Sequence, residues 1–581
     1  MNRRGKWDSK ALSMLLALAL VVSLGLVTTG PVAAQQTWIV NADGSGNYTT
    51  IQAAIDAAGS DDIIQVGAGN YTEDLVIPAG KDGLELAGAG CGVSIIKGVA
   101  TADWDLGEPP VYNIRFDEFS GVSGVKIHGF TIESPDVPTN HFASGMVLNG
   151  QDIEIYNNCF VSKGAAAAVD NYCVAIQTWR WSAAPNSDIT GLRIYDNTFT
   201  SAGDLWVYQG VFVNRDGENA GDVTVSGNTF TGNIHMGIAY EGNNAEISGN
   251  EMTSDFAGAG IAVMDWAKGA QNNVEVIDNT VEGFARGIVI GHGDGDQALT
   301  DISVTGNTVQ NNDTGILMRS SAGGVVVNYN NIVDNSTYGV ENTHTATLDA
   351  THNWWGDASG PTHAGNLEGT GDPVSDGVDY GHWLGAPLDL PAVYYDTLGP
   401  GENVVDASEE ADTIVTLNVT AEASETDIYI ARYQSQPFPD EPFPDETLGK
   451  YIDIHVSNPE NVIWPVYVQV FYTDDEVAAA GVDENTLRLY YFCEDDCHFQ
   501  CCSDTGVNTA EKFIWANVSH EEASDLAYTP FGGGGDARLL PPVGGEAHPI
   551  SRLGILALWI ALGAAVIAGV TIFVRRRRAA A

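Results

Sequence analysis

Aromatic, acidic and basic side chains follow a short glycine-plus-apolar segment that recurs along the first half of the chain. The segment reads GVFV, GIAY, GIAV, GIVI, GILM and GVEN, between residues 210 and 342. The residues just beyond it, or at the equivalent point of an earlier repeat, are Trp179, Arg180, Trp181, Arg215, Asp216, Glu241, Asp265, Trp266, Lys268, His292, Asp294, Asp296, Arg319 and His344. If the segments stack, these residues form one lengthwise ribbon, with about 5 Å between turns. Aromatic faces, carboxylates and arginines along such a ribbon suit a polysaccharide that lies parallel to the stack.

Two kinds of catalysis fit the ribbon. In a polysaccharide lyase, the aspartates would hold calcium while an arginine neutralises or deprotonates a substrate uronate. In a glycosidase, Asp265 would form a carboxylate pair with Asp216 or Asp294. The catalytic candidates are Asp216, Asp265, Asp294, Arg215 and Arg319, and the possible calcium ligands are Asp294 and Asp296.

The same ribbon also fits binding without catalysis. The candidate polysaccharide-binding residues are Trp179, Arg180, Trp181, Glu241, Trp266, Lys268 and His292. A third interpretation is structural, because the corners of a repeat protein are polar and hydrated whether or not they bind anything. The sequence leaves a binding protein, an enzyme and a non-catalytic adhesin or envelope scaffold open, and we place binding of extracellular polysaccharide first.

A second repeated phrase positions the ribbon. It is a short β-branched alternation that leads to an asparagine, as in LRIYDNTF and VTVSGNTF. The asparagines are Asn158, Asn197, Asn228, Asn250, Asn279, Asn307, Asn330 and Asn353. Alternation predicts strands, and a repeat of about 22 to 39 residues predicts a solenoid. We expect the asparagines to stack in a hydrogen-bonded ladder inside a tight bend, where their tolerance of the left-handed conformation would help.

Both ends of this solenoid are visible in the sequence. TTIQAAIDAAGSDD, residues 49 to 62, predicts a short amphipathic helix that caps the first turn, with Thr49 or Thr50 at its start and Gly59 at its end. THNWWGDASGPTH, residues 351 to 363, contains the last asparagine of the ladder and two tryptophans. We interpret these tryptophans as an apolar cover over the final turn rather than as a site, because solenoids need terminal caps.

NADGSGNYTTIQAAIDAA (41 to 58) resembles the N-terminal cap of pectin methylesterases and other pectin-lyase-like β-helix proteins. The GNTF repeats and the NWWG…GP ending are similar to the parallel β-helix repeats of many prokaryotic surface and periplasmic proteins. The resemblance implies a right-handed parallel β-helix. It implies no activity, because the Gly-Arg-Pro-Trp signature of pectin methylesterases and the catalytic strings of polygalacturonases and pectate lyases are missing.

The later part of the chain changes character. After about residue 385 the asparagine phrase stops, and short alternating segments such as WPVYVQVFYT and KFIWANVSH predict an antiparallel β-sandwich. Cys493, Cys497, Cys501 and Cys502 follow one of these strands. In an oxidising compartment we expect local disulfides among them, with the pairing open, and we expect Cys91 to be buried and unpaired.

The two ends of the chain predict export and anchoring. A basic start and the apolar run 12–27 describe a cleavable signal peptide. Residues 553–574 contain no charge and are followed by four arginines, which predicts one transmembrane helix with a cytoplasmic C-terminus. With 76 acidic against 25 basic residues, the chain would repel nucleic acid. The expected partners are therefore extracellular polysaccharide and the cell membrane, the latter through the protein's own C-terminal helix.

These expectations divide the all-β chain into six segments: 1–34 signal peptide, 35–385 right-handed parallel β-helix, 386–531 β-sandwich stalk domain, 532–552 Gly/Pro linker, 553–574 transmembrane helix and 575–581 cytoplasmic tail. Calcium is the one cofactor that the acidic surface suggests. Glycosylation sequons occur at Asn47, Asn70, Asn312, Asn335, Asn418 and Asn517.

Overall fold

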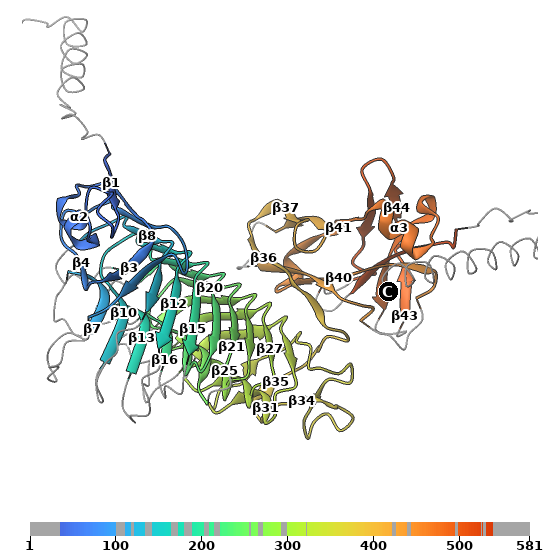
Figure 1. Ribbon diagram of the computed structural model, residues 1–581. Coiled ribbons are helices and arrows are strands. Elements are labelled where there is room, and N and C mark those ends of the chain that lie inside the picture. Colours follow the sequence, from blue (N-terminus) through green and yellow to red (C-terminus); the bar gives the residue numbers. More distant parts are fainter. Residues whose placement is uncertain are drawn as a thin grey trace, which may run out of the picture.

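In the residues that it describes, the computed structural model is all-β apart from short helices (Figure 1). The residues that it describes are 35–99, 111–117, 121–133, 142–163, 172–178, 189–202, 208–213, 221–254, 257–264, 271–291, 299–320, 322–420, 426–437, 443–493, 498–523, 526 and 530–538. Strands of three parallel sheets follow one another around a solenoid, and an antiparallel region follows it, as the sequence predicts.

The longest sheet, sheet A, has 13 parallel strands. They are β1 (Thr37–Val40), β2 (Ile63–Val66), β5 (Glu85–Gly88), β8 (Lys126–His128), β11 (Glu154–Tyr156), β14 (Arg193–Tyr195), β17 (Val223–Ser226), β20 (Ala245–Ser248), β23 (Gln271–Ile277), β26 (Leu299–Thr305), β29 (Ala322–Asn328), β32 (Leu348–Asp349) and β35 (Val378–Asp379). Each strand pairs in register with the strand one turn later, so equivalent residues stack in rows along the axis.

Sheets B and C have ten strands each. Sheet B contains β3 (Gly69–Thr72), β6 (Ser94–Lys97), β9 (Thr131–Glu133), β12 (Cys159–Lys163), β15 (Thr198–Ala202), β18 (Thr229–Gly232), β21 (Glu251–Thr253), β24 (Thr280–Glu282), β27 (Thr308–Gln310) and β30 (Asn331–Val333). Sheet C contains β4 (Leu75–Ile77), β7 (Val111–Phe116), β10 (Phe142–Leu148), β13 (Tyr172–Thr178), β16 (Tyr208–Val213), β19 (Met236–Tyr240), β22 (Ala259–Val263), β25 (Arg286–Ile290), β28 (Thr314–Met318) and β31 (Tyr338–Asn342).

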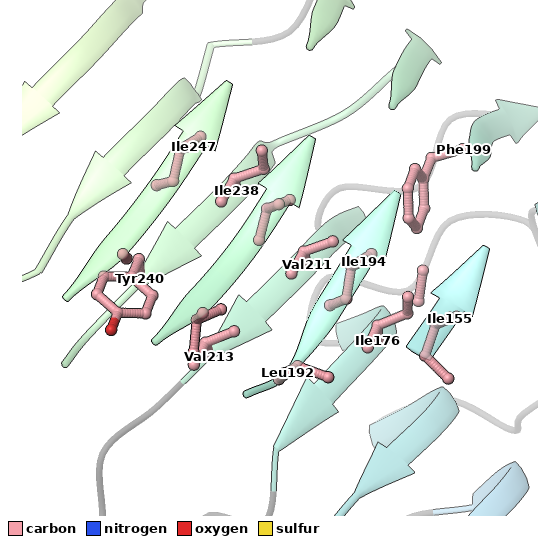
Figure 2. Close-up of a cluster of buried hydrophobic side chains, with 14 of the residues drawn as sticks. Ile155, Ile176, Leu192, Ile194, Phe199, Val211, Val213, Ile238, Tyr240 and Ile247 are labelled. Carbon is pink, nitrogen blue, oxygen red and sulfur yellow. The ribbon is translucent and has the colours of Figure 1, made fainter. Parts of the chain in front are cut away.

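Alternation explains the core between the sheets. The inward residues of sheet A, such as Ile155, Ile194 and Ile247, have no exposed surface. In Figure 2 they lie with inward residues of sheet C, including Ile176 and Ile238, in one apolar cluster. The β-branched phrase before each asparagine is thus the buried side of sheet A, and its intervening polar residues form the outer surface.

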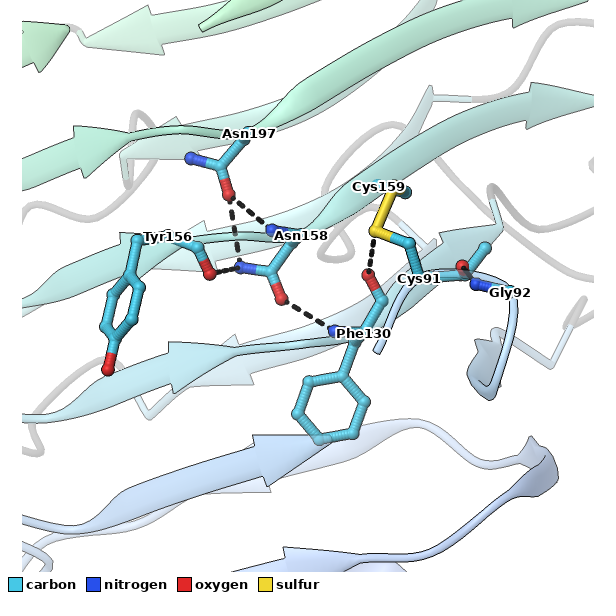
Figure 3. Close-up of a disulfide and its surroundings, with 8 residues drawn as sticks. Cys91, Gly92, Phe130, Tyr156, Asn158, Cys159 and Asn197 are labelled. Carbon is cyan, nitrogen blue, oxygen red and sulfur yellow. Dashed lines mark hydrogen bonds between the residues drawn. A yellow bond between two sulfur atoms is a disulfide. The ribbon is translucent and has the colours of Figure 1, made fainter. Parts of the chain in front are cut away.

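The asparagine ladder is confirmed. In every rung from Asn158 to Asn330, the side-chain Oδ1 of the next asparagine accepts both a backbone N–H and the Nδ2–H₂ group, as between Asn158 and Asn197 at 3.0 and 3.2 Å (Figure 3). The left-handed conformation, however, falls on the residue before the asparagine, for example Asp196 (φ 54°) and Asp278 (φ 56°). The expected amide hydrogen bonds are therefore confirmed, and the expected left-handed conformation at the asparagine itself is wrong.

Sequence reasoning missed a second, shorter ladder. Asn312 donates to Asn335, which in turn donates to Asp372 at 2.8 Å. Both asparagines are almost fully buried, at 2% and 3% exposed. The sequons at these two positions are therefore inaccessible to a glycosylating enzyme in the folded protein.

The glycines of the recurrent apolar segment lie inside the strands of sheet C rather than at their start. A Cβ on Gly260 would lie 2.3 Å from Cγ1 of Val281, and one on Gly237 would lie 2.8 Å from the sulfur of Met252. Val281 and Met252 come from sheet B. Glycine is thus required because the side chains of sheet B fill the space where its own side chain would lie.

The N-terminal cap is confirmed as helix α2 (Ile51–Ala57), whose residues Ile51, Ala54 and Ile55 are buried against the first turn. Thr50 precedes the helix without a side-chain cap, and the carboxylate of Glu73 accepts the first N–H groups instead.

The expectation of a buried, free Cys91 is wrong. Cys91 is on the surface and forms a disulfide with Cys159, from the next but one turn (Figure 3).

Two antiparallel sheets share one apolar core in the C-terminal region. One contains β36 (Leu388–Leu398), β39 (Thr426–Tyr433), β40 (Glu446–Val456), β46 (Phe531–Gly535), β42 (Arg488–Cys493) and β43 (His498–Cys501), and the other contains β37 (Gly401–Ala407), β38 (Thr413–Val419), β41 (Val462–Phe471), β45 (Phe513–Val518) and β44 (Thr505–Asn508). Helix α3 (Asp474–Ala480) and the 3-10 turns η1 (Pro459–Asn461) and η2 (Glu484–Thr486) connect strands. The pair β33 (Pro361–Thr362) and β34 (Gly371–Pro373) lies at the end of the solenoid.

The predicted cysteine hairpin is present, but the predicted disulfides are not supported where they can be assessed. Strands β42 and β43 pair as a hairpin, and Cys501 and Cys502 are both free thiols. The side chains of Cys493 and Cys497 lie outside the described residues. No helix in the described ranges is long and apolar enough to cross a membrane, and the predicted span 553–574 lies outside those ranges.

A buried interface joins the two regions. Leu384, Leu388, Tyr433, Phe492 and other apolar residues form a cluster with Tyr329 and Trp354 of the solenoid. At its centre, Tyr329 Oη donates to Asp453 Oδ2 of β40 at 2.9 Å. Trp354 therefore covers the end of the solenoid, as expected, and it packs there against residues of the C-terminal region.

Candidate functional site

The ribbon predicted from the sequence borders sheet C. The recurrent segments stack in register, so the residues after them fall at one edge of this sheet. Of the predicted members, the structure describes Glu241, Arg319 and His344. The others lie outside the described residues: Trp179, Arg180, Trp181, Arg215, Asp216, Asp265, Trp266, Lys268, His292, Asp294 and Asp296.

The described members do not form a continuous charged surface. Arg319 is exposed and His344 is half-buried, but Glu241 is only 2% exposed. Two turns separate Glu241 from Arg319, and Met264 and Gly291 occupy the intermediate positions. A binding role at the surface is therefore not supported for Glu241.

Much of the neighbouring outer face of sheet C is apolar and buried, although half-buried Gln209, Arg286 and Glu341 lie in the same rows. Its apolar residues form a cluster separate from the solenoid core: Val174, Phe212, Met236, Ala239, Ala259, Ala262, Met264, Val289 and Leu317. Such a face offers few hydrogen-bonding groups to a polar ligand. A polar surface with ordered contacts lies on sheet A.

The outer face of sheet A carries two parallel rows near its N-terminal half. The charged row is Glu85, Lys126, Glu154 and Arg193, and the ring row is His128, Tyr156 and Tyr195. The rings of His128 and Tyr156 stack at 4.6 Å, and those of Tyr156 and Tyr195 stack at 4.9 Å with an interplanar angle of 3°. The register of the strands imposes this stacking, because one ring projects from each turn.

Ion pairs and hydrogen bonds connect the two rows. Lys126 Nζ lies 3.0 Å from Glu154 Oε1, and Tyr195 Oη donates to Glu154 Oε2 at 2.9 Å. His128 Nε2 lies 3.1 Å from Glu85 Oε1. Burial and the hydrogen bond to Glu154 raise the pKa of Tyr195 to about 12, so its hydroxyl remains a donor. These contacts fix the rings without help from a ligand.

The ring row ends at a change of side-chain size. After Tyr195, the next two turns place Ser226 and Ser248 in the same row. No side chain of the following strand is therefore large enough to cover the second face of Tyr195 as Tyr156 covers the first. The guanidinium of Arg193 lies 5.2 Å from the centre of the Tyr195 ring.

Further along the outer face of sheet A, the charged row continues with carboxylates on β20 and β23. Glu246 and Glu275 are paired on adjacent strands, and Asp278 follows in the bend. Burial, with the nearby charges of Glu410 and Glu246, raises the pKa of Asp278 to about 7. Burial and Glu246 likewise raise the pKa of Glu275. Glu410 belongs to the C-terminal region, so that region contributes to the electrostatics of this face.

A pocket of about 390 Å³ lies at the end of the solenoid, where the last ladder residues meet the β33–β34 loop. Its lining residues are Asp334, Asn335, Ser336, Trp355, Gly356, Thr362, Thr370, Gly371, Asp372 and Pro373. Part of the segment 351–363, interpreted from sequence as a structural end only, thus also lines a cavity.

No group of three or more His, Cys, Asp or Glu side chains within the described ranges is arranged to hold a metal ion. The proposed calcium ligands Asp294 and Asp296 lie outside those ranges, so calcium binding at these residues stays a prediction.

The ring row was not singled out from the sequence, although a signal for it exists. Tyr156 and Tyr195 each lie two residues before a ladder asparagine, in IEIYNN and LRIYDN. Two residues before the ladder is an outward position of sheet A, so alignment of the repeats on their asparagines would place both rings in one row.

A family model described as a right-handed β-helix region matches residues 188–354. None of the curated proteins matches the chain in sequence. Among solved structures, the chain is similar to the A-module of a mannuronan C-5 epimerase from Azotobacter vinelandii, at 17% identity and a TM-score of 0.37, covering 57% of this chain and 94% of that one.

The chain is also similar to a tailspike protein of an E. coli bacteriophage in complex with a pentasaccharide, at 10% identity and a TM-score of 0.40, covering 86% and 93%. Pectin methylesterase from carrot gives 15% identity and a TM-score of 0.28, covering 55% and 90%. Identity and TM-score are low in all three, and nothing about function follows from them. The stacked strands and the family match together show that residues 188–354 belong to the family of right-handed β-helix regions.

Proposed function

We propose that the protein binds a polysaccharide along the outer face of sheet A. The observation that carries this proposal is the ring row, whose three rings stack along the solenoid axis and whose last ring, Tyr195, is followed by serines. A sugar ring could stack on the second face of Tyr195 as a further member of the row if the guanidinium of Arg193, which lies over this ring, moves aside. Aromatic rings with a polar end suit such a partly wet interface.

The charged row supports the same ligand. Arg193 and Glu246 lie in the turns before and after the proposed stacking position, and they offer a donor and an acceptor to sugar hydroxyls. The rows repeat at about 4.8 Å along a straight axis, which suits an extended chain rather than a compact ligand. Because the contacts within the rows are already made, little ordering entropy would be lost on binding.

The ribbon beside sheet C remains a second part of this proposal. Trp179 and Trp266 are two of its three tryptophans, and we expect alanine at either position to weaken retention of the polysaccharide without unfolding the protein. Unchanged retention in both variants would remove the ribbon from the binding surface.

A catalytic function is the alternative that one observation on sheet A favours. Burial raises the pKa of Asp278 to about 7, so this carboxyl keeps its proton until close to neutral pH. A carboxyl group with a raised pKa is what general acid catalysis of glycoside hydrolysis uses. We expect Asp278→Asn to abolish release of new reducing ends if this alternative holds. The lyase with Asp265 and Arg215 in the ribbon is tested in the same assay, by following unsaturated products with and without calcium.

We further propose that the protein is exported and held at the cell membrane by residues 553–574, with the β-helix outside. The N-terminal and C-terminal sequence patterns support this placement. Detection of the β-helix on intact cells by protease accessibility would test it, and full protection of the β-helix in intact cells would contradict it.

The binding proposal is tested by affinity electrophoresis of the purified full-length chain through gels that contain neutral or acidic polysaccharides. Tyr195→Ser is the sharpest variant, because serine is the natural residue at the same row position in the next two turns. We expect retention to weaken about fivefold to tenfold, the effect of losing one stacking contact of about 1 kcal/mol. Thr231→Ser, on the outer face of sheet B, is the control and should leave retention unchanged. Equal retention of all three proteins would refute the proposed site.

A further inference from the structure

The interface between the solenoid and the C-terminal region contains a buried carboxyl group. Asp453 of β40 is 1% exposed, and Tyr329 Oη of the solenoid donates to its Oδ2 at 2.9 Å. The other oxygen, Oδ1, is buried without a hydrogen-bond partner among the described residues, and no ion pair between described residues includes Asp453. A charged carboxylate in such a place is costly, and the neutral carboxyl group is much less so.

Other titratable side chains face this pair from both sides of the interface. The C-terminal region contributes Tyr429 and Tyr433 from β39 and His455 from β40, and the solenoid contributes His352. The rings of His352 and His455 lie 4.6 Å apart. Histidine carries a positive charge only at acid pH, so at alkaline pH these neighbours supply no cation to an ionised Asp453.

Carboxylates also gather on both sides at the rim of the interface. On the solenoid, the charge of Glu410 from the C-terminal region adds to the burial that raises the pKa of Asp278. The charges of Asp427 from β39 and of Glu275 from the solenoid likewise add to the burial that raises the pKa of Tyr429. Like charges on the two sides repel each other, and this repulsion is strongest where all of them are ionised.

Each region has a hydrophobic core of its own apart from the interface. Tyr240 belongs to the core of the solenoid and Phe531 to the core of the C-terminal region, and neither has any exposed surface. Tyr329 belongs to a third cluster, which contains residues of both regions. Separation of the two regions would therefore uncover this third cluster and leave both cores covered.

We propose that the interface is a pH-sensitive joint, which is closed while Asp453 is protonated and opens when this carboxyl group is ionised. In the open joint Asp453 meets water, where its ordinary pKa is 3.8, whereas burial in the closed joint raises the pKa to about 7. The contribution of the protonated carboxyl is therefore complete below about pH 4, is lost as the pH rises towards 7, and changes no further above that. Between pH 5 and pH 8 the ratio of closed to open molecules falls about 100-fold.

The joint fixes the orientation of the solenoid at acid pH and frees it at alkaline pH. Oxidation of Tyr329 by hydroxyl radicals in the full-length chain measures the opening, because this side chain is 1% exposed in the closed joint. The reaction would be run at pH 5, 6, 7 and 8 at constant ionic strength, and oxidation would be measured by mass spectrometry relative to half-buried Tyr338 of β31. We expect the relative oxidation of Tyr329 to rise with pH, by up to about 100-fold. Tyr240 and Phe531 should stay protected throughout.

Two single-charge variants identify the group that is responsible. Asp453→Asn keeps the shape of the side chain and an acceptor for Tyr329, and we expect low oxidation of Tyr329 at every pH. Glu521→Gln, at an exposed position just beyond β45, removes one charge next to the sheet that does not contain Asp453, and it should respond to pH as the wild type does.

Three results would overturn the joint. They are oxidation of Tyr329 that does not change with pH, the same increase in Asp453→Asn as in the wild type, and oxidation of Tyr240 in parallel with Tyr329. The last of these would show unfolding of the solenoid rather than separation of the two regions. If Asp453→Asn does not fold, the wild-type profiles of Tyr329 and Tyr240 decide the question by themselves.

Discussion

The amide of Asn279 shows how one side chain can satisfy several buried groups of a solenoid. Its Oδ1 accepts from the backbone N–H and from Nδ2 of Asn250, and its own Nδ2 donates to the carbonyl of Ile247 and to Asn307. A side chain without the amide would leave donors of the previous rung and a carbonyl unpaired in the interior. Buried unpaired groups cost about 1–3 kcal/mol each.

Replacement of a ladder asparagine is therefore expected to destabilise the protein strongly. We predict that Asn279→Ala lowers the free energy of unfolding by about 3 kcal/mol. Thr253→Ala, on the exposed face of sheet B, is the matched control and should change it by less than about 0.5 kcal/mol. Urea unfolding followed by circular dichroism measures both values, and equal midpoints for the two variants would contradict the structural role of the ladder.

The Cys91–Cys159 disulfide is a second contribution of single residues. It closes a loop across 68 residues of sequence. Closure of a loop of this length restricts the unfolded chain, and the expected contribution to stability is about 2–4 kcal/mol. We predict that the double variant Cys91→Ser, Cys159→Ser has a free energy of unfolding that is lower by this amount. It should therefore unfold at a lower urea concentration than the wild-type protein. A reducing agent should produce the same loss in the wild-type protein and none in the variant.

The packing of sheet B against sheet C explains the recurrent glycines. Gly260 is in a strand of sheet C, and the space beside it is filled by Val281 of sheet B. The glycine can be recognised in the sequence because it recurs. Its neighbour Val281 cannot, because the two residues are 21 positions apart and belong to different strands. A repeat pattern predicts which residues are equivalent, and it does not predict which side chains of different sheets meet.

A side chain at position 260 should clash with Val281, and a smaller residue at position 281 should relieve the clash. Gly260→Ala would place its Cβ 2.3 Å from Val281 Cγ1, and we expect it to destabilise the protein by about 1–3 kcal/mol. Gly323→Ala is the control, because no atom lies within 4 Å of its added Cβ. The double variant Gly260→Ala, Val281→Ala should recover part of the loss in thermal unfolding. No recovery would mean that the clash is not the cause.

Assembly of the two regions depends on residues that depart from the repeat. The bend before the ladder carries Asn, Asp or Gly in most turns, but Tyr329, His352 and His382 in consecutive turns, all with positive φ. A bulky residue in this conformation is strained, and the interface with the C-terminal region stabilises it. Tyr329 stacks with Tyr429 and donates to Asp453, both from that region.

This interface predicts a pH dependence of stability. Burial raises the pKa of Asp453 from 3.8 to about 7. The folded protein therefore favours the protonated carboxyl, whose stabilising effect is complete below pH 4 and is lost as the pH rises towards 7. We predict that Asp453→Asn increases stability at pH 8 by about 2 kcal/mol and has little effect at pH 4. Urea midpoints across this range test it, and a variant less stable than wild type at pH 8 would contradict it.

The sequence predicts the solenoid because its period, its alternation and its asparagines repeat. It also predicts an antiparallel region after residue 385. It does not predict the contact between Tyr329 and Asp453, because these residues lie 124 positions apart and neither belongs to a repeated pattern. The ring row and the pocket differ in the same way. Tyr156 and Tyr195 are recoverable from the repeat register, whereas the pocket joins Asp334, Trp355 and Thr370 from a bend, a strand end and a loop that have no shared pattern.

Protection of the ring row from oxidation in solution would show whether the polysaccharide lies on sheet A. The full-length chain would be exposed to hydroxyl radicals with and without a polysaccharide that retains it, and oxidation of each tyrosine would be measured by mass spectrometry. We predict lower oxidation of Tyr156 and Tyr195 in the complex and unchanged oxidation of Tyr467, which lies on β41 of the C-terminal region. Unchanged oxidation of Tyr156 and Tyr195 in a chain that is still retained would show that the polysaccharide binds elsewhere.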